Sequence, residues 1–306
     1  MEFLRLLEGL RTPVLDHVMG VITQLGGETI FMLAAMVAYW CYNKAFGYYM
    51  MSVGFTGTAL NQFLKLVCRI PRPWVRDGGF TIVESARAEA TGYSFPSGHT
   101  QNAVTIFGTA AHWMHGTAVR WTALAAIALV AFSRMYLGVH TPADVLFSLA
   151  CGAALTFALY PVVRRAEEHP RVYAYLFGGM LAVAAAYVLF IEFYPFAPGL
   201  DAGNFASAKK NAYTLAGAVA GLCVAFPIER RWVRFTPRAP WWGQLFKVGL
   251  GLAGVVLLKT LLKAPLAALF AGHDAANAVR YFVVVVFAVA VWPAAFRLFR
   301  PAGKNG

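Results

Sequence analysis

Apolar blocks of roughly 20 residues recur along this chain between residues 20 and 299, and short polar joints separate them. Each block is long enough to cross the ~30 Å hydrocarbon core of a bilayer as an α-helix. A bilayer offers no water to backbone polar groups, so such blocks fold as helices. Only 13% of the 306 residues are charged, against about 25% in a soluble domain. The chain is therefore expected to be an all-α, polytopic helical membrane protein.

Reading apolar stretches bounded by charge, proline or glycine predicts about nine transmembrane helices. They cover residues 20–42, 45–68, 98–115, 119–137, 142–163, 172–192, 210–228, 245–269 and 279–299. Residues 1–19 mix charged and apolar side chains and lack the basic start of a signal peptide, so we expect an interfacial N-terminal segment. The rest divides into a core that carries the motifs described below, residues 20–165, and C-terminal transmembrane helices, residues 166–306.

The net charge of +12 reflects basic residues placed at the ends of the predicted spans. No basic run is interleaved with aromatics as in a nucleic-acid module, which excludes nucleic acid as a partner and leaves the membrane itself. The basic residues of one set of joints are Lys44, Arg120, Arg164, Arg165, Arg171, Arg230, Arg231, Arg234, Arg238, Lys247, Arg297, Arg300 and Lys304. The positive-inside rule makes this the cytoplasmic side. The loop at 69–97 and the joint at 138–141 then lie outside.

Three segments on the predicted outer side carry residues suited to phosphate chemistry. They are Lys65 with Arg72-Pro73, then Pro96-Ser97-Gly98-His99, then Ser133-Arg134 with His140 and Asp144. Lys65, Arg72 and Arg134 lie at or near span ends with no carboxylate at helical spacing, which invites a functional explanation. The alternative is that these long side chains extend to lipid headgroups.

The second segment has the composition of a helix start. Pro96 and Gly98 suit such a start, and the free N–H groups at a positive helix end receive phosphate. Alone, the tetrapeptide would more often be an ordinary helix start. Its neighbours in the other two segments favour an anion site.

His140 and Asp144 flank another helix start, in which Thr141 is the N-cap and Pro142 the first helical residue. One interpretation of Asp144 is a capping box, which needs no catalysis. The other is that Asp144 holds one imidazole nitrogen of His140 and presents the second nitrogen as a nucleophile. Both roles are compatible with this spacing.

These three segments, in this order, resemble the signature of the type 2 phosphatidic acid phosphatase superfamily. The resemblance covers roughly residues 45–160, a six-helix phosphatase core, and leaves the last four predicted spans unexplained. It implies that His140 attacks phosphorus to form a phosphohistidine, that Asp144 orients His140, and that His99 protonates the leaving group and then activates water. It further implies that Lys65, Arg72, Arg134, Ser97 and the Gly98 N–H hold the phosphoryl oxygens.

The resemblance implies an integral membrane phosphatase that hydrolyses a lipid phosphate monoester. Fixed cations and amides stabilise the charge of phosphoryl transfer, so no metal and no cofactor are implied. The expected location is the plasma membrane, with the active site on the extracytoplasmic side. The segment from Ser133 to His140 is similar to that of sphingosine 1-phosphate phosphatases, while other members act on phosphatidic acid, phosphatidylglycerol phosphate or isoprenoid diphosphates such as undecaprenyl diphosphate.

Several alternatives stay open at this stage. A lipid phosphotransferase would use the same intermediate, and a phospholipid or phosphate transporter would use the cradle only for binding. The Gly- and Ala-rich later spans allow close helix packing, either around a lipid groove or in a homo-oligomer. In the loop at 69–97, Glu84 and Glu89 are interpreted as solvated charges. Its aromatic residues, such as Phe80 and Tyr93, form either a lid over the headgroup or an aromatic belt.

Overall fold

The computed structural model describes residues 1–196 and 199–299, and every regular element in those residues is helical. The all-α expectation is thereby confirmed. The chain splits into two compact units, and the first comprises residues 1–32, 53–161 and 195–208. The second comprises residues 33–52, 162–194 and 209–306. Arg300 and Lys304, which contributed to the predicted sidedness, lie outside the described residues.

Six helical stretches in the described residues are long and apolar enough to cross a membrane. They are Thr117–Tyr136, Pro142–Glu168, Arg171–Phe193, Ala202–Val233, Trp241–Leu269 and Ala275–Phe299, and a bent pair near the N-terminus makes up to seven. The predicted spans at 45–68 and 98–115 do form helical runs, but polar side chains such as Asn61 and Gln101 interrupt their apolar character. The predicted count of nine is not confirmed.

The predicted span at 20–42 is broken in the structure. Helix α2 (Pro13–Gln24) begins early because Thr12 caps it, accepting from the Leu15 N–H at 3.3 Å, and Pro13 suits the first helical position. A 43° bend separates α2 from α3 (Glu28–Val37) and the π-helical η1 (Ala38–Tyr42). Gly26 lies at the bend, where a Cβ would stand 2.4 Å from the carbonyl oxygen of His99. Glycine is needed here for close approach of two backbones.

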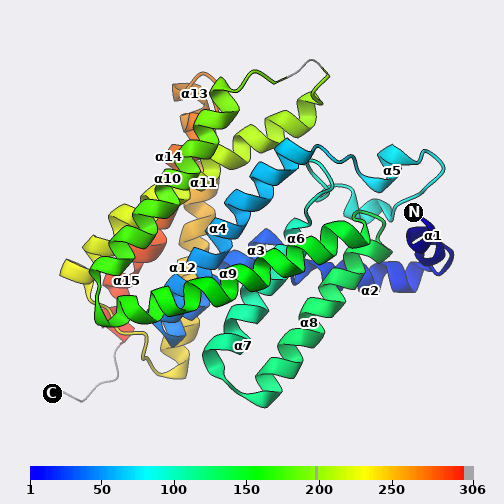
Figure 1. The fold of residues 1–306 in the computed structure, drawn as a ribbon. Helices are drawn as coiled ribbons and strands as arrows, with labels where there is room; N and C mark the ends of the chain where they lie inside the picture. Colours follow the sequence, from blue (N-terminus) through cyan, green and yellow to red (C-terminus); the bar gives the residue numbers. More distant parts are fainter. Residues whose placement is uncertain (197–198, 300–306) are drawn as a thin grey trace. The chain divides into compact units, whose positions relative to one another are not determined.

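A helical hairpin supports the three sequence segments in the first unit. The run of α6 (Gly98–Ala103), η3 (Val104–Gly108) and α7 (Thr109–Met114) turns back into α8 (Thr117–Tyr136) and packs along it, as Figure 1 shows. Helix α2 packs on the same α8. Between α8 and α9 (Pro142–Glu168) the chain turns at Gly138, whose φ of +79° is a conformation that other residues avoid. Helix α4 (Lys44–Cys68) leads into the long loop.

The N-terminal helix α1 (Glu2–Gly9) holds the long loop that follows α4. Leu4 of α1 packs with Phe80 and Ile82 of that loop, which contains the short helices α5 (Pro73–Arg76) and η2 (Glu84–Ala86). Arg11 donates to the carbonyl oxygens of Tyr136 at 3.1 Å and Thr81 at 2.8 Å. Phe80 and Tyr93 are therefore buried core residues of the loop, and neither the lid nor the belt interpretation describes them.

Except for residues 202–208 at the start of α11, which belong to the first unit, the second unit contains the remaining helices. They are α10 (Arg171–Phe193), α11 (Ala202–Ile228), η4 (Glu229–Val233), α12 (Trp241–Leu261), α13 (Lys263–Leu269), α14 (Ala275–Val286), η5 (Phe287–Val291), α15 (Trp292–Ala294) and η6 (Ala295–Phe299). Its core includes packed rings of Tyr48, Tyr173, Phe177 and Phe226, with ring centroids 5.1 to 5.6 Å apart. Helix α12 packs against α14 and η1.

Candidate active site

The start of α6 places Ser97 and Gly98 at a helix N-terminus, as predicted. Ser97 is buried and caps the helix, its Oγ accepting from the Thr100 N–H at 3.4 Å and from the Thr100 hydroxyl at 3.0 Å. The Ser97 N–H donates to the Asp144 carbonyl oxygen at 3.3 Å, which ties this helix start to the start of α9. The first N–H groups of a helix have no partner within it, so those of Gly98 and His99 are suited to bind an anion.

The turn between α8 and α9 brings Arg134 and His140 together. The Val139 and His140 N–H groups both donate to the Arg134 carbonyl oxygen, at 3.2 and 3.3 Å. Both side chains are buried, with 1% and 2% of their surface exposed. The Arg134 guanidinium donates to Thr23 Oγ1 at 2.8 Å, whereas its Nε has no hydrogen-bond partner in the described part of the chain. An unpartnered, buried guanidinium nitrogen is costly unless a ligand binds it.

Asp144 combines the two roles that the sequence left open. Its Oδ2 accepts from the Thr141 N–H at 2.7 Å, and its own N–H donates to Thr141 Oγ1 at 3.3 Å, which is a reciprocal capping box. The same Oδ2 accepts from the Ser94 hydroxyl at 2.6 Å and lies 3.5 Å from His140 Nδ1. That separation is slightly beyond hydrogen-bond length, and contacts of this kind often shorten when substrate binds.

Arg72 lies on the other side of the His140 ring. Its Nη1 is 3.0 Å from His140 Nε2 and also donates to the Val139 carbonyl oxygen at 2.9 Å. Its remaining nitrogens donate to the carbonyl oxygens of Thr91 at 2.8 Å and Gly92 at 3.1 Å. An arginine has no lone pair to accept with, so Nε2 is the acceptor in this pair. The unprotonated nitrogen of His140 therefore faces the cations.

The electrostatic surroundings keep His140 neutral. Burial lowers the pKa of His140 well below its ordinary value, and the positive charges of Arg72 and Arg134 lower it further. Burial also lowers the pKa of Arg72, to about 10, which leaves this group charged at neutral pH. A neutral imidazole beside fixed positive charge is the form that a nucleophile toward phosphate requires.

Lys65 completes a group of three buried cations. It lies in the last turn of α4, 6% exposed, and its Nζ donates to the Tyr93 carbonyl oxygen. Among the described residues, Lys65, Arg72 and Arg134 form no ion pair with a carboxylate. Buried charges without a counter-ion are expensive. The arrangement is therefore suited to a ligand that supplies negative charge.

His99 meets a partner that the sequence reasoning missed. Its Nε2 lies 3.1 Å from Glu89 Oε2, and the other Glu89 oxygen accepts from Gln24 Nε2 at 3.0 Å. The hydrogen bond from His99 lowers the pKa of Glu89 to about 2, helped by Gln24 and opposed by partial burial. The prediction that Glu89 is merely solvated is thus not what the geometry shows, whereas Glu84 does form an exposed pair with Arg87.

Asn61 is a second residue that sequence reasoning passed over. It lies one turn before Lys65 in α4, is 4% exposed, and faces Gly98. Neither its amide oxygen nor its amide nitrogen has a hydrogen-bond partner among the described residues. The signal available in the sequence was its position four residues before Lys65, which places both side chains on one helix face.

Two family models match this chain. The PAP2 superfamily model covers residues 43–168, the stretch that contains all eight predicted site residues. A second model, described as a transmembrane extension of PAP2 superfamily phosphatases, covers residues 213–304. Over 165 residues the chain is 30% identical to the undecaprenyl-diphosphatase BcrC of Bacillus subtilis, a match that covers 52% of this chain and 81% of that protein. The chain belongs to the PAP2 superfamily.

Other relatives agree with this assignment. The chain is 33% identical over 162 residues to phosphatidylglycerophosphatase B of Bacillus subtilis, covering 48% of this chain and 75% of that protein. It is 33% identical over 70 residues to a lipid A 4'-phosphatase of Porphyromonas gingivalis, covering 23% and 30%. No solved structure matches significantly. The expected resemblance and the expectation of an integral membrane phosphatase are confirmed. The family's transmembrane extension, from residue 213 onward, accounts for the last three of the four spans that the sequence left unexplained, and the predicted span at 172–192 lies outside both models.

Proposed function

We propose that this PAP2 protein hydrolyses a lipid phosphate monoester through a phosphohistidine formed on His140, without a metal ion. The observation that carries the proposal is the buried, neutral imidazole of His140, whose Nε2 faces Arg72 within a group of three unpaired cations. A site built only to bind phosphate needs cations but has no use for a nucleophile held next to a carboxylate.

The proposed reaction has two steps. In the first, Arg72 Nη1 transfers its hydrogen bond from His140 Nε2 to a phosphoryl oxygen, the freed Nε2 attacks phosphorus, and the bond from phosphorus to the lipid oxygen breaks. His99 gives its proton to the departing alkoxide. In the second, His99 takes a proton from water, the oxygen attacks phosphorus, and the phosphorus–nitrogen bond breaks to release phosphate. Asp144 stabilises the positive charge on the phosphorylated imidazole through Nδ1. Glu89 holds the His99 ring for both proton transfers.

Lys65, Arg72 and Arg134 supply the electrostatic stabilisation that divalent cations supply in other phosphoryl-transfer enzymes. Phosphoryl transfer spreads negative charge over three equatorial oxygens, and fixed guanidinium groups bind such oxygens in pairs. The two buried guanidinium groups of Arg72 and Arg134 also disfavour a metal ion at the same place by direct repulsion. The two helix-start N–H groups at Gly98 and His99 complete the cradle.

The names of the similar proteins support the proposed substrate class. Similar proteins are named for undecaprenyl diphosphate, phosphatidylglycerol phosphate and lipid A, all of which carry phosphate on a membrane-embedded tail. We therefore expect a lipid phosphate here, with a diphosphate or a phosphotransfer reaction as the alternatives. We propose that the site faces the extracytoplasmic side of the plasma membrane, and the excess of basic residues in the other joints supports this orientation.

Phosphate release in detergent micelles with a chelator tests the proposal. Substrates should include phosphatidic acid, phosphatidylglycerol phosphate, sphingosine 1-phosphate, and undecaprenyl mono- and diphosphate. We expect release from at least one, abolished by His140→Ala and unaffected by His17→Ala, a matched change at an exposed histidine of α2. Turnover that survives His140→Ala would refute the phosphohistidine, and turnover that needs a metal would refute metal independence. Phosphate transferred to an added alcohol would indicate a phosphotransferase, and lipid movement without release a transporter.

A further inference from the structure

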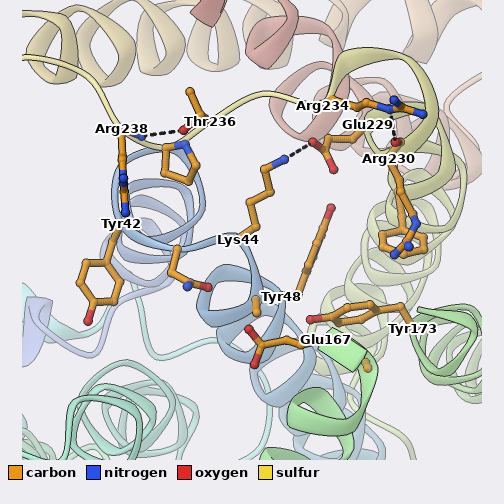
Figure 2. A pocket seen from close by; sticks show the side chains of 15 residues that line it. Tyr42, Lys44, Tyr48, Glu167, Tyr173, Glu229, Arg230, Arg234, Thr236 and Arg238 are labelled. Carbon is orange, nitrogen blue, oxygen red and sulfur yellow. Dashed lines mark hydrogen bonds and ion pairs between the residues drawn. The ribbon is translucent and has the colours of Figure 1, made fainter. Parts of the chain in front are cut away.

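The second unit contains a pocket that includes none of the candidate catalytic residues. Its volume is about 560 Å³, within the range of small-molecule sites. The walls are formed by the start of α4, the junction of α9 and α10, and the start of η4 together with the segment that follows η4 (Figure 2). The residues used below are Lys44, Tyr173, Glu229, Arg230, Arg234 and Arg238.

The pocket has more positive charge than its own acids neutralise. Glu229 is buried and pairs with Lys44, whose Nζ lies 2.5 Å from Oε1. Glu167, the other acid of the lining, pairs with Arg164 outside it. The acids are therefore occupied. Three arginines remain, at positions 230, 234 and 238, and none of them forms an ion pair among the described residues.

A buried donor without a partner lines the same pocket. Tyr173 is 4% exposed, and its hydroxyl forms no hydrogen bond with any described residue. Figure 2 shows this hydroxyl turned toward the side of the pocket where Glu167 and Tyr48 lie. Leaving a buried hydroxyl unpaired is unfavourable, so the pocket is more stable with a group that accepts from it.

The wall that carries the arginines is held in place. Arg234 ends η4 with a φ of +45°, and its N–H donates to the Glu229 carbonyl oxygen at 2.7 Å. Beyond it, the fully buried Lys247 of α12 donates to the carbonyl oxygens of Thr236 and Pro237, at 3.3 and 3.0 Å. The backbone that carries the arginines is therefore held by interior contacts, while the arginine side chains themselves are exposed.

We propose that this pocket binds a phosphate group, presented either by an anionic phospholipid headgroup or by a soluble phosphate. Guanidinium groups recognise phosphate oxygens by paired hydrogen bonds, and the Tyr173 hydroxyl adds one more donor. All its cations belong to the joints that the charge distribution assigns to the cytoplasmic side. The pocket lies in the second unit, to which the transmembrane extension of the family contributes.

Hydrogen exchange of the backbone at residues 226–240 tests the proposal on the full chain in nanodiscs. One arm compares phosphatidylcholine discs with discs that also contain phosphatidylglycerol. The other adds inorganic phosphate to phosphatidylcholine discs. Arg230→Gln is compared with Arg231→Gln; both arginines are exposed, but only Arg230 lines the pocket. Tyr173→Phe removes the unpaired hydroxyl and keeps the ring packing.

We expect added phosphatidylglycerol or phosphate to slow hydrogen exchange at residues 226–240 in the wild type and in Arg231→Gln. The concentration of the added molecule that gives half of the full protection should be about tenfold higher in Arg230→Gln and about fivefold higher in Tyr173→Phe than in the wild type. Protection in the lipid arm alone assigns the site to a headgroup, and protection in both assigns it to phosphate itself. No protection in either arm, or equal protection in Arg230→Gln and Arg231→Gln, overturns the proposal. Turnover is not part of this measurement, so its outcome does not depend on whether the chain hydrolyses lipid phosphates.

Discussion

Glu89 reaches His99 from the long loop and holds the imidazole that the proposed mechanism uses for proton transfer. Gln24 binds the second carboxylate oxygen, so the carboxylate is fixed on both sides. Fixing the ring matters because proton transfer requires a donor within hydrogen-bond reach of the leaving oxygen. Glu89 therefore acts as a positioning residue, through His99.

We predict that Glu89→Gln lowers kcat about tenfold while KM changes little, because substrate contacts remain. The alkaline limb of the pH–rate profile should also move to lower pH, since a negative charge no longer stabilises the imidazolium. Glu84→Gln, a change in the exposed pair with Arg87, serves as the control and should leave both unchanged. Equal effects of the two substitutions would show that loop charge in general, and not the His99 contact, matters.

His140 should make stability depend on pH. Its folded-state pKa is lowered by burial and by the neighbouring cations, so below the unfolded-state value near 6.5 the unfolded chain binds a proton that the folded chain does not. Stability is then fully present above about pH 6.5 and falls by at most about 1.4 kcal/mol per pH unit below it, until the folded pKa is reached. Melting of the wild type and His140→Asn between pH 5 and 8 checks this, because the variant should lack that slope. Parallel curves would contradict it.

At this scale, local patterns marked the helix starts at Ser97 and at Asp144, whereas the roles of Lys65, Arg72, Arg134 and His99 were predicted from the resemblance to the family. Ser97 is an N-cap beside a helix-start glycine, and Asp144 is three residues from its own cap. Glu89 and Asn61 were not predicted because nothing local marks them. The contact of Glu89 depends on how the loop folds back, which only the long-range contacts of α1 and α8 determine.

The bend between α2 and α3 is the element on which the placement of α6 depends. Thr23 and Gln24, at the end of α2, contact Arg134 and Glu89, and Gly26 lies against the His99 backbone. A straight span at 20–42, as the sequence predicted, would lack this break. The hydropathy of residues 20–42 correctly indicated an apolar block. A bend at the two neighbouring glycines, Gly26 and Gly27, does not change mean hydropathy, so the pattern could not indicate it.

We predict that Gly26→Ala destabilises the protein by about 1 to 3 kcal/mol, as overpacking usually does. The added Cβ would lie 2.4 Å from the His99 carbonyl oxygen and 2.8 Å from a Val130 methyl, so α6 must shift. Turnover should fall more than stability alone explains. Gly9→Ala, where the added Cβ meets nothing within 4 Å, is the matched control and should be neutral or slightly stabilising. A Gly26→Ala protein with wild-type melting and turnover would show that the contact relaxes freely.

The ends of helices also depend on tertiary contacts that the local sequence does not show. The predicted start of the span at 210 is late because α11 begins at Ala202, where Asp201 accepts from the Asn204 N–H at 2.7 Å. Lys209 and Lys210 made this first part look like a loop, yet Lys209 pairs with Glu192. A cap is visible in the sequence, but a tertiary ion pair that permits charge inside a helix is not.

For the whole molecule, the central prediction is which side of the membrane each joint between helices faces. The joints with basic residues should face the cytoplasm, and the end of α4 should face outward. Cys68 is exposed at that end, so it provides a natural label. In a variant with the other three cysteines changed to alanine, a membrane-impermeant maleimide added to intact cells should modify Cys68.

The matched control moves the thiol to the other side. When Cys68→Ala and Arg231→Cys are added to the variant that lacks the other three cysteines, labelling of the new thiol should require permeabilised cells. The reverse pattern would place the candidate active site in the cytoplasm. The orientation is expected to follow from the Lys and Arg bias of the joints.

The capping box at Thr141 and Asp144 gives the Asp144 carboxylate two roles, one in folding and one in the candidate active site. A selection for folded protein and a selection for active protein both act on the same carboxylate, because one oxygen starts α9 and approaches His140. In a saturation library, abundance and activity should fall together at position 144, so inactive variants there say little about chemistry. At position 89, where no helix depends on the side chain, the two scores should separate, and that separation makes an exposed loop residue the more informative reporter of catalysis.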